Sequence, residues 1–327
     1  MLESRVNMRG TVIKSTGSWY TVLVDKDTKV ECGIKGKFRI KGIKTTNPIA
    51  VGDKVIFEME KDGRGVINSI ENRKNYIIRK SINLSKQSHI IAANVDQALL
   101  VVTLAYPRTS FGFIDRFLLT AEAYHIPTKI IFNKIDLFEK DTELKGIDKS
   151  AKNIKMEELD QIIKSYEKVG YKCYKVSATK KTDIEVIQGI TKDKTTLIAG
   201  HSGVGKSTLV NSMDSNLNLK VGEISDVHFK GKHTTTFAAM HPLAYGGFII
   251  DTPGIKELGL VDMEKYEISN YFPEMQALKS KCKFNNCLHI NEPKCAIIEA
   301  LNNGEIGASR YNSYMGIMKE EDLEDDY

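Results

Sequence analysis

The sequence has no apolar run long enough to cross a bilayer, and it opens on charged residues instead of a secretory leader. The apolar stretch from Ala98 to Ala105 is short and is preceded by Asp96. These absences exclude a membrane-spanning protein, and we expect a soluble protein of the cytoplasm. Its 327 residues, 41% of them hydrophobic, are enough for two or three domains with ordinary cores.

Cysteine is also scarce, since the chain has only five, yet three of them fall in one short segment. Its pattern is Cys282-x4-Cys287-x-His289-x5-Cys295. Thiolates together with an imidazole favour Zn²⁺ over Mg²⁺ or Ca²⁺, and a site with four protein ligands is typically structural. The alternative is a disulfide with a spare thiol, which is rare in cytosolic proteins. We predict one structural zinc ion per chain.

A glycine-rich loop lies in the second half of the chain. A β-type run at 195–199 leads into Gly200-His-Ser-Gly-Val-Gly-Lys206-Ser207, and a helix-like segment follows. This context suits a phosphate-binding loop, because backbone N–H groups and a helix N-terminus then face the phosphates. Lys206 is expected to reach the β- and γ-phosphate oxygens, and Ser207 to bind Mg²⁺. The predicted nucleotide-binding residues here are Gly200, Ser202, Gly203, Val204, Gly205, Lys206, Ser207 and Thr208.

A second motif, Asn133-Lys134-Ile135-Asp136, indicates which base is bound. It follows the apolar run 130–132, so it lies at the C-terminal end of a strand, where open α/β sheets bind ligands. Asp136 can accept two N–H bonds from guanine, and adenine cannot supply them. Asn133, Lys134 and Asp136 are therefore predicted to bind GTP or GDP.

Three further segments complete the predicted nucleotide site. Ser177-Ala178 follows a strand-like run, and the Ala178 N–H is expected to contact the guanine carbonyl. Asp251-Thr-Pro-Gly254 closes another apolar run, with Asp251 as the metal partner and Gly254 as the γ-phosphate sensor. The threonine-rich stretch 231–236 is suited to a mobile switch, in which Thr235, within one position, completes the Mg²⁺ shell.

The chain lacks the glutamine that orients the attacking water in many GTPases, because Ile255 follows Gly254. Gly203 stands where potassium-dependent GTPases carry an asparagine, which disfavours that mechanism. His233, in the middle of the switch, is the nearest ionisable candidate for positioning the water. The alternative is an exposed histidine without a role. We expect slow intrinsic hydrolysis that a partner stimulates.

The order of the motifs is unusual, since the guanine motif precedes the phosphate loop by about 65 residues and ordinary small GTPases have the reverse order. Rearrangement of this kind is tolerated where the original chain ends lie close together. With Ile114-Asp-Arg-Phe-Leu118, the run 233–236 and the cysteine-rich segment, the chain closely resembles the RsgA family of circularly permuted, small-ribosomal-subunit-dependent GTPases. The resemblance covers nearly the whole chain. It implies a role late in maturation of the small ribosomal subunit, and in it His233 resembles the family's proposed catalytic histidine.

The first 75 residues have short β-type runs and glycines at turns, which predict a small barrel. Within it Lys35, Lys37, Arg39 and Lys41 alternate with other residues, so on a strand they share one face. Residues 1–80 contain 17 Lys and Arg against 9 Asp and Glu, a surplus that suits RNA binding. The resemblance implies an OB barrel that binds ribosomal RNA.

These observations predict a multidomain α/β protein with three domains. Residues 1–75 form an N-terminal OB-fold β-barrel, and 76–265 a circularly permuted phosphate-loop GTPase domain. Residues 266–327 form a C-terminal zinc-binding helical domain with an acidic tail. The expected partners are GTP with Mg²⁺, and the small ribosomal subunit with its rRNA. We expect a monomer that does not bind membranes.

Two functions of other classes are also compatible with a phosphate loop. A kinase that phosphorylates a metabolite needs an acceptor pocket and leaves Asn133, Asp136 and Ser177-Ala178 unexplained. A passive rRNA-binding scaffold would use the nucleotide only as a structural ligand. Measuring GTP turnover with and without small subunits separates the three.

Overall fold

The computed structural model describes most of the chain. The described residues are 7–34, 48–80, 88–105, 107–139, 156–217, 219, 238–251 and 264–319. The chain divides into two compact units. The first unit comprises Met1–Ala98, Ile184–Ser202 and Lys206–Val261, and the second Leu99–Asp183, Gly203–Gly205 and Asp262–Tyr327. No helix within the described ranges is long and apolar enough to cross a membrane.

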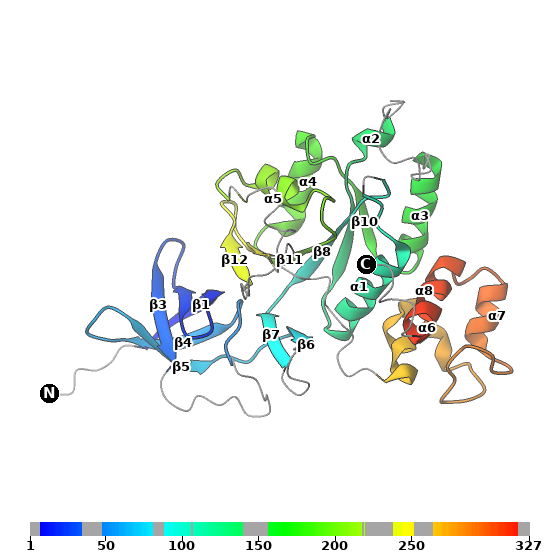
Figure 1. The fold of residues 1–327 in the computed structure, drawn as a ribbon, viewed down its shortest axis with the longest axis horizontal. Coiled ribbons are helices and arrows are strands. Elements are labelled where there is room, and N and C mark those ends of the chain that lie inside the picture. Colours follow the sequence, from blue (N-terminus) through cyan, green and yellow to red (C-terminus); the bar gives the residue numbers. More distant parts are fainter. Residues whose placement is uncertain are drawn as a thin grey trace, which may run out of the picture. The chain divides into compact units, whose positions relative to one another are not determined.

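Five strands in the first unit form the predicted N-terminal barrel (Figure 1, blue). They are β1 (Asn7–Ser15), β2 (Tyr20–Leu23), β3 (Lys29–Ile34), β4 (Lys54–Met59) and β5 (Gly65–Ile70). The strands pair in the order β1-β2-β3-β5-β4, and β4 also pairs with β1, which closes the sheet. Alternate residues point inwards and form a core that includes Val12, Tyr20, Val22, Phe57 and Ile67. The prediction of a barrel at this end of the chain is confirmed.

The first unit also contains the strands around the phosphate loop. β11 (Thr195–Ala199) pairs in parallel with β13 (Phe248–Asp251), and β13 pairs antiparallel with β12 (Ala239–Pro242). α5 (Lys206–Met213) follows β11, and α4 (Lys181–Thr191) precedes it. β6 (Tyr76–Lys80) and β7 (Ser88–Ala93) form a separate antiparallel pair.

The second unit contains the strands that carry the guanine motif. β9 (Thr128–Phe132) lies between β8 (Gln97–Val102) and β10 (Lys172–Lys175), and β9 and β10 are parallel. The helices are α1 (Phe111–Ala123), α2 (Asp136–Glu139) and α3 (Met156–Lys168). β8 is buried along its whole length, as expected for a strand with both faces covered.

Short helices make up the C-terminal part of the second unit (Figure 1, orange to red). They are the 3-10 helix η2 (Lys265–Tyr271), α6 (Pro273–Lys279), α7 (Ala296–Asn302) and α8 (Ala308–Lys319). α8 packs against α1 and η2, while α6 packs against η2 and α7.

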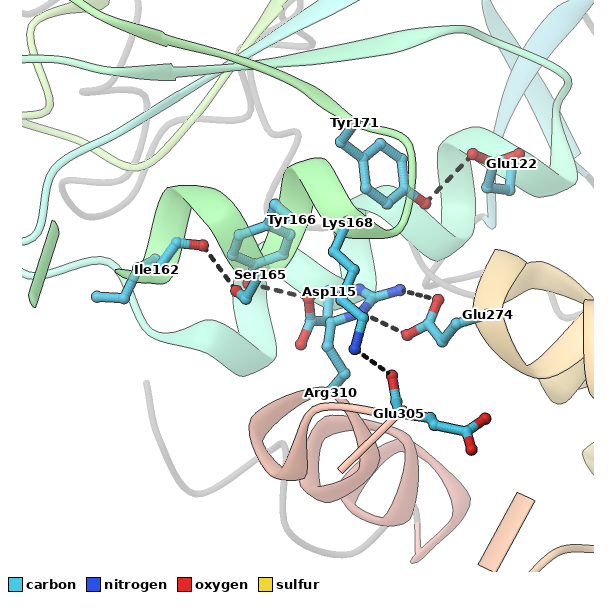
Figure 2. Close-up of polar contacts among 10 residues, drawn as sticks. All are labelled: Asp115, Glu122, Ile162, Ser165, Tyr166, Lys168, Tyr171, Glu274, Glu305 and Arg310. Carbon is cyan, nitrogen blue, oxygen red and sulfur yellow. Dashed lines mark hydrogen bonds and ion pairs between the residues drawn. The ribbon is translucent and has the colours of Figure 1, made fainter. Parts of the chain in front are cut away.

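A buried arginine joins this helical part to α1 and α3 (Figure 2). Arg310 Nη1 donates to Asp115 Oδ1 at 2.6 Å, and Arg310 Nε donates to Glu274 Oε1 at 2.8 Å. The Tyr166 hydroxyl donates to the same Asp115 oxygen at 3.0 Å. The side chains of Arg310 and Asp115 are 2% and 0% exposed, and the guanidinium lies over the Phe272 ring. The cluster therefore connects α8 with α1, α3 and α6 out of contact with water.

We predict that Arg310→Leu destabilises the attachment of α8 to α1. Removing one member of a buried ion pair leaves an uncompensated charge, which typically costs about 3–5 kcal/mol. Native-state hydrogen exchange of the α8 amides should show a loss of protection of that size.

The matched control is Lys168→Met. The exposed Lys168 amine on α3 donates to the Glu305 carbonyl at 2.9 Å, so it links the same parts of the chain at the surface (Figure 2). Exposed contacts of this kind contribute about 0–1 kcal/mol. Equal effects of the two substitutions would contradict the importance of the buried cluster.

Candidate functional site

The phosphate loop turns sharply between β11 and α5. Gly200, Gly203 and Gly205 have φ angles of 142°, 80° and 93°, which residues with a Cβ rarely adopt. A Cβ at Gly205 would lie 2.5 Å from Asn133 Nδ2, so the close approach of the guanine motif also requires glycine here. The loop therefore has the predicted strand-loop-helix context and touches the second predicted motif.

Lys206 lies at the start of α5 and folds back over the loop. Its Nζ donates to the carbonyl oxygens of Gly200 and His201, both at 2.7 Å. Lys206 and Ser207 are 6% and 7% exposed. The ammonium is thus held close to the backbone of the loop, and the buried Ser207 follows it at the helix N-terminus, where an anion is stabilised.

Asp251 is the last residue of β13. The register of β13 against β11 places Asp251 beside Ile198, near the strand end that leads into Gly200. Gly254, Thr235 and His233 lie outside the described residues, as does the basic stretch 35–41.

Asn133 connects three segments of the second unit. Its backbone N–H donates to the Val102 carbonyl at 2.9 Å, which fixes the end of β9 beside β8. Its side-chain Nδ2 donates to the Val204 carbonyl at 2.8 Å, and its Oδ1 accepts from the Ala178 N–H at 3.3 Å. Asn133 is 2% exposed, so both halves of its amide are satisfied within the protein.

Lys134 makes a second link to the phosphate loop. It adopts a φ of 61°, and its Nζ donates to the Gly203 carbonyl at 2.7 Å. Burial lowers the pKa of Lys134, and the neighbouring Asp136 opposes the shift. Asp136 begins α2, so its carboxylate lies beside a helix N-terminus.

The Ser177-Ala178 segment follows β10 as predicted. The Ser177 N–H donates to Asp183 Oδ2 at 2.7 Å, and the Ser177 and Thr179 hydroxyls lie 2.8 Å apart. The Ala178 N–H, expected to contact guanine, donates to Asn133 in this structure. Its contact with the base stays a prediction.

The structure thus brings Asn133, Lys134 and Ala178 together with Gly203 and Val204. The bridging role of the Asn133 side chain was not predicted. The sequence did contain a signal for this bridging role. The motif lies at a strand end, and a buried amide side chain needs both a donor and an acceptor as partners.

The four predicted metal ligands meet at one point in the second unit. One ligand atom from each of Cys282, Cys287, His289 and Cys295 lies within 4.8 Å of the others. His289 Nδ1 is 3.6 Å from the Cys282 sulfur and 3.4 Å from the Cys295 sulfur. All five cysteines of the chain are free thiols, so the disulfide alternative is not observed.

The spacing of these atoms fits a metal ion. A tetrahedral ion at about 2.3 Å from sulfur and about 2.0 Å from nitrogen separates its ligand atoms by roughly 3.5–3.8 Å. The observed separations of 3.4, 3.6 and 4.0 Å are close to these values, and no pair in the cluster is more than 4.8 Å apart. The cluster could therefore hold a metal ion if its ligand atoms move closer by about 1 Å or less.

Two sets of hydrogen bonds fix the loop that carries His289. The Glu292 carboxylate accepts the backbone N–H of Leu288 at 2.7 Å and of Ile290 at 2.8 Å. From α8, the hydroxyls of Tyr311 and Tyr314 donate to the carbonyls of His289 and Leu288, each at 2.7 Å. His289 adopts a φ of 59°, and these bonds hold its backbone in that conformation.

Two solved structures resemble this one over almost the whole chain. YjeQ from Thermotoga maritima is 32% identical with a TM-score of 0.74, and the match covers 96% of this chain and 98% of that one. YloQ, described as a circularly permuted GTPase, is 28% identical with a TM-score of 0.72, covering 100% and 98%.

Sequence comparisons agree with these structures. Small ribosomal subunit biogenesis GTPase RsgA of Bacteroides fragilis is 50% identical over 315 residues, covering 96% of this chain and 97% of the relative. The protein of the same name from Flavobacterium psychrophilum is 52% identical over 318 residues, covering 96% and 94%. The RsgA N-terminal domain family matches residues 9–67, and the RsgA GTPase family matches residues 70–261. The chain therefore belongs to the RsgA GTPase family.

Proposed function

We propose that this chain binds the small ribosomal subunit, hydrolyses GTP to GDP and phosphate, and acts late in the maturation of that subunit. The observation that carries the proposal is the contact of Asn133 and Lys134 with Val204 and Gly203. This contact joins the base-selecting motif to residues 203–204 of the phosphate loop. The relatives named above are biogenesis GTPases of the small subunit, which supports the choice of partner.

The proposed nucleotide contacts divide between phosphates and base. When GTP binds, the Lys206 ammonium exchanges its hydrogen bonds to the loop carbonyls for contacts with the β- and γ-phosphate oxygens. The Asp136 carboxylate accepts hydrogen bonds from the guanine N–H groups. Mg²⁺ supplies charge stabilisation, with Ser207, Thr235 and Asp251 as the residues that would hold it, Asp251 through water. Gly254 senses the γ-phosphate, and His233 positions the attacking water.

The proposed metal of the cysteine cluster is zinc, one structural ion per chain. Three thiolates and an imidazole select Zn²⁺ over harder cations, and the ligand spacing suits a tetrahedral ion. The proposed partner of the barrel is ribosomal RNA. A factor of this kind works where ribosomes are assembled, in the cytoplasm, and we propose that it acts as a monomer.

We predict that small ribosomal subunits stimulate GTP turnover by the wild-type chain. The reason is that the residue after Gly254 is apolar, so the free protein lacks a usual group for orienting water. Turnover is measured as phosphate release with and without subunits. A lack of stimulation would contradict the proposed function.

Lys206→Ala extends this test to the scaffold alternative. The substitution removes the buried ammonium of the phosphate loop, so both GTP binding and stimulated turnover should be lost. If subunit maturation in cells then proceeds normally, GTP hydrolysis is not the function and the scaffold alternative is correct.

We predict that His233→Ala lowers subunit-stimulated turnover by about 100-fold or more, in the range typical of a lost general acid–base group. GTP affinity should stay close to wild type. The control is His125→Asn, which removes an exposed imidazole two residues after α1, where the φ of 54° suits asparagine. Unchanged stimulated turnover in His233→Ala would exclude the catalytic role.

We predict that Cys295→Ser removes most of the bound zinc and unfolds the C-terminal helices. Zinc binding contributes on the order of 10 kcal/mol to the folding of isolated finger peptides, and this short segment has little core of its own. Zinc content by elemental analysis and helicity by circular dichroism are the measurements. Cys173→Ser is the matched control, because Cys173 lies on β10 and outside the cluster. A chain that folds fully without zinc would contradict the prediction.

A further inference from the structure

Two loops of the barrel place an aromatic ring and a cation together at the surface. Trp19 ends the loop between β1 and β2, and Arg64 ends the loop between β4 and β5. The Arg64 guanidinium carbon lies 5.1 Å from the centroid of the Trp19 ring. Trp19 is 42% exposed, while the barrel aromatics Tyr20 and Phe57 are fully buried. Packing of the barrel core therefore does not explain why an indole lies here beside an arginine.

Strand register explains why the indole lies on the outer surface of the barrel. Tyr20 pairs with Cys32, and both point into the core, so Trp19 stands opposite Gly33 on the outer face. A Cβ at Gly33 would lie 3.6 Å from Cζ3 of Trp19. This is an ordinary van der Waals distance, so the indole lies close against β3.

Both loops are closed by their own hydrogen bonds. The backbone N–H and the hydroxyl of Thr16 both donate to the Trp19 carbonyl, at 3.0 and 3.2 Å. In the other loop the Glu60 N–H donates to the Arg64 carbonyl at 2.7 Å, and Asp62 Oδ1 accepts the Arg64 N–H at 3.1 Å. The ring and the guanidinium therefore project from ordered backbone, which reduces the entropy lost when a ligand binds.

The charges around the ring indicate what kind of group fits there. Arg64 is positive, and its pairing with Asp62 at 3.6 Å is exposed and weak. On β3, two residues before Gly33, Glu31 accepts a hydrogen bond from the Thr21 hydroxyl at 2.6 Å. A phosphate lying over β3 would be repelled by Glu31, whereas the neutral face of a base would not.

We propose that Trp19 and Arg64 form a stacking platform for an unpaired RNA base. The base stacks on the indole, and Arg64 supports the ring and neutralises the adjoining phosphate. Five-stranded barrels of this type bind oligonucleotides through strands 2 and 3 and the loops between strands 1 and 2 and strands 4 and 5, which is where these residues lie. The inference rests on the proposed function and names residues through which the barrel holds RNA.

The test uses the only tryptophan of the chain as its own probe. A uridine oligomer of about ten nucleotides, within the usual site size of such a barrel, is titrated into the full-length protein. We expect saturable quenching of the Trp19 fluorescence. With a labelled oligomer, Trp19→Ala should weaken binding by about 5- to 150-fold, the range expected for one lost stacking contact. Trp19→Phe should retain part of the affinity, and Arg64→Ala should lose part of it.

Tyr266→Ala is the matched control, because it removes an aromatic ring that is 56% exposed and lies outside the barrel. It should leave oligomer affinity unchanged, and circular dichroism should show that every variant is folded. Wild-type affinity in Trp19→Ala would overturn the proposal. A second outcome would also overturn it. If the oligomer does not bind the wild type, yet Trp19→Ala binds the small subunit more weakly, the partner of Trp19 is a protein. Stimulation of wild-type turnover by subunits is measured separately, so failure of the platform and failure of the proposed function are distinguishable.

Discussion

The side chain of Asn133 holds together the part of the site that binds the base. Its amide donates to the Val204 carbonyl and accepts from the Ala178 N–H, and both contacts are buried. Aspartate has the same shape but offers no donor, so Val204 would face a charged acceptor. Alanine would leave two buried backbone groups unpaired. These bonds depend on position in space and not on the order of segments along the chain, which explains how a permuted GTPase keeps its site.

Much of this site was predictable because each motif follows an apolar run that forms a strand. The runs before Asn133, Ser177 and Gly200 became β9, β10 and β11. β9 and β10 are parallel, and parallel strands present their C-terminal ends on one edge of a sheet, so the residues after these two strands tend to meet. The contact between Lys134 Nζ and the Gly203 carbonyl was not predictable, since it requires a φ of 61° that no local pattern indicates.

The metal cluster and the Arg310 cluster show where prediction from sequence stops. All four metal ligands lie within 14 residues, so their spacing alone indicates a site. Arg310 and Asp115 are 195 positions apart in the chain, and neither position is unusual in its own segment. A buried charge needs a partner, but sequence alone does not show which distant helix supplies it.

One helix connects the two clusters. Arg310, in the first turn of α8, bonds to Asp115 on α1. Tyr311, the next residue, and Tyr314, about one turn further along, bond to the carbonyls of His289 and Leu288 in the metal-binding loop. A helix is stiff over so short a length, so α8 fixes the metal-binding loop relative to α1 through these contacts. α1 lies in the chain between β8 and β9, and Asn133, the residue after β9, donates its backbone N–H to Val102 at the end of β8, so the C-terminal helices pack on the helix that joins these two strands.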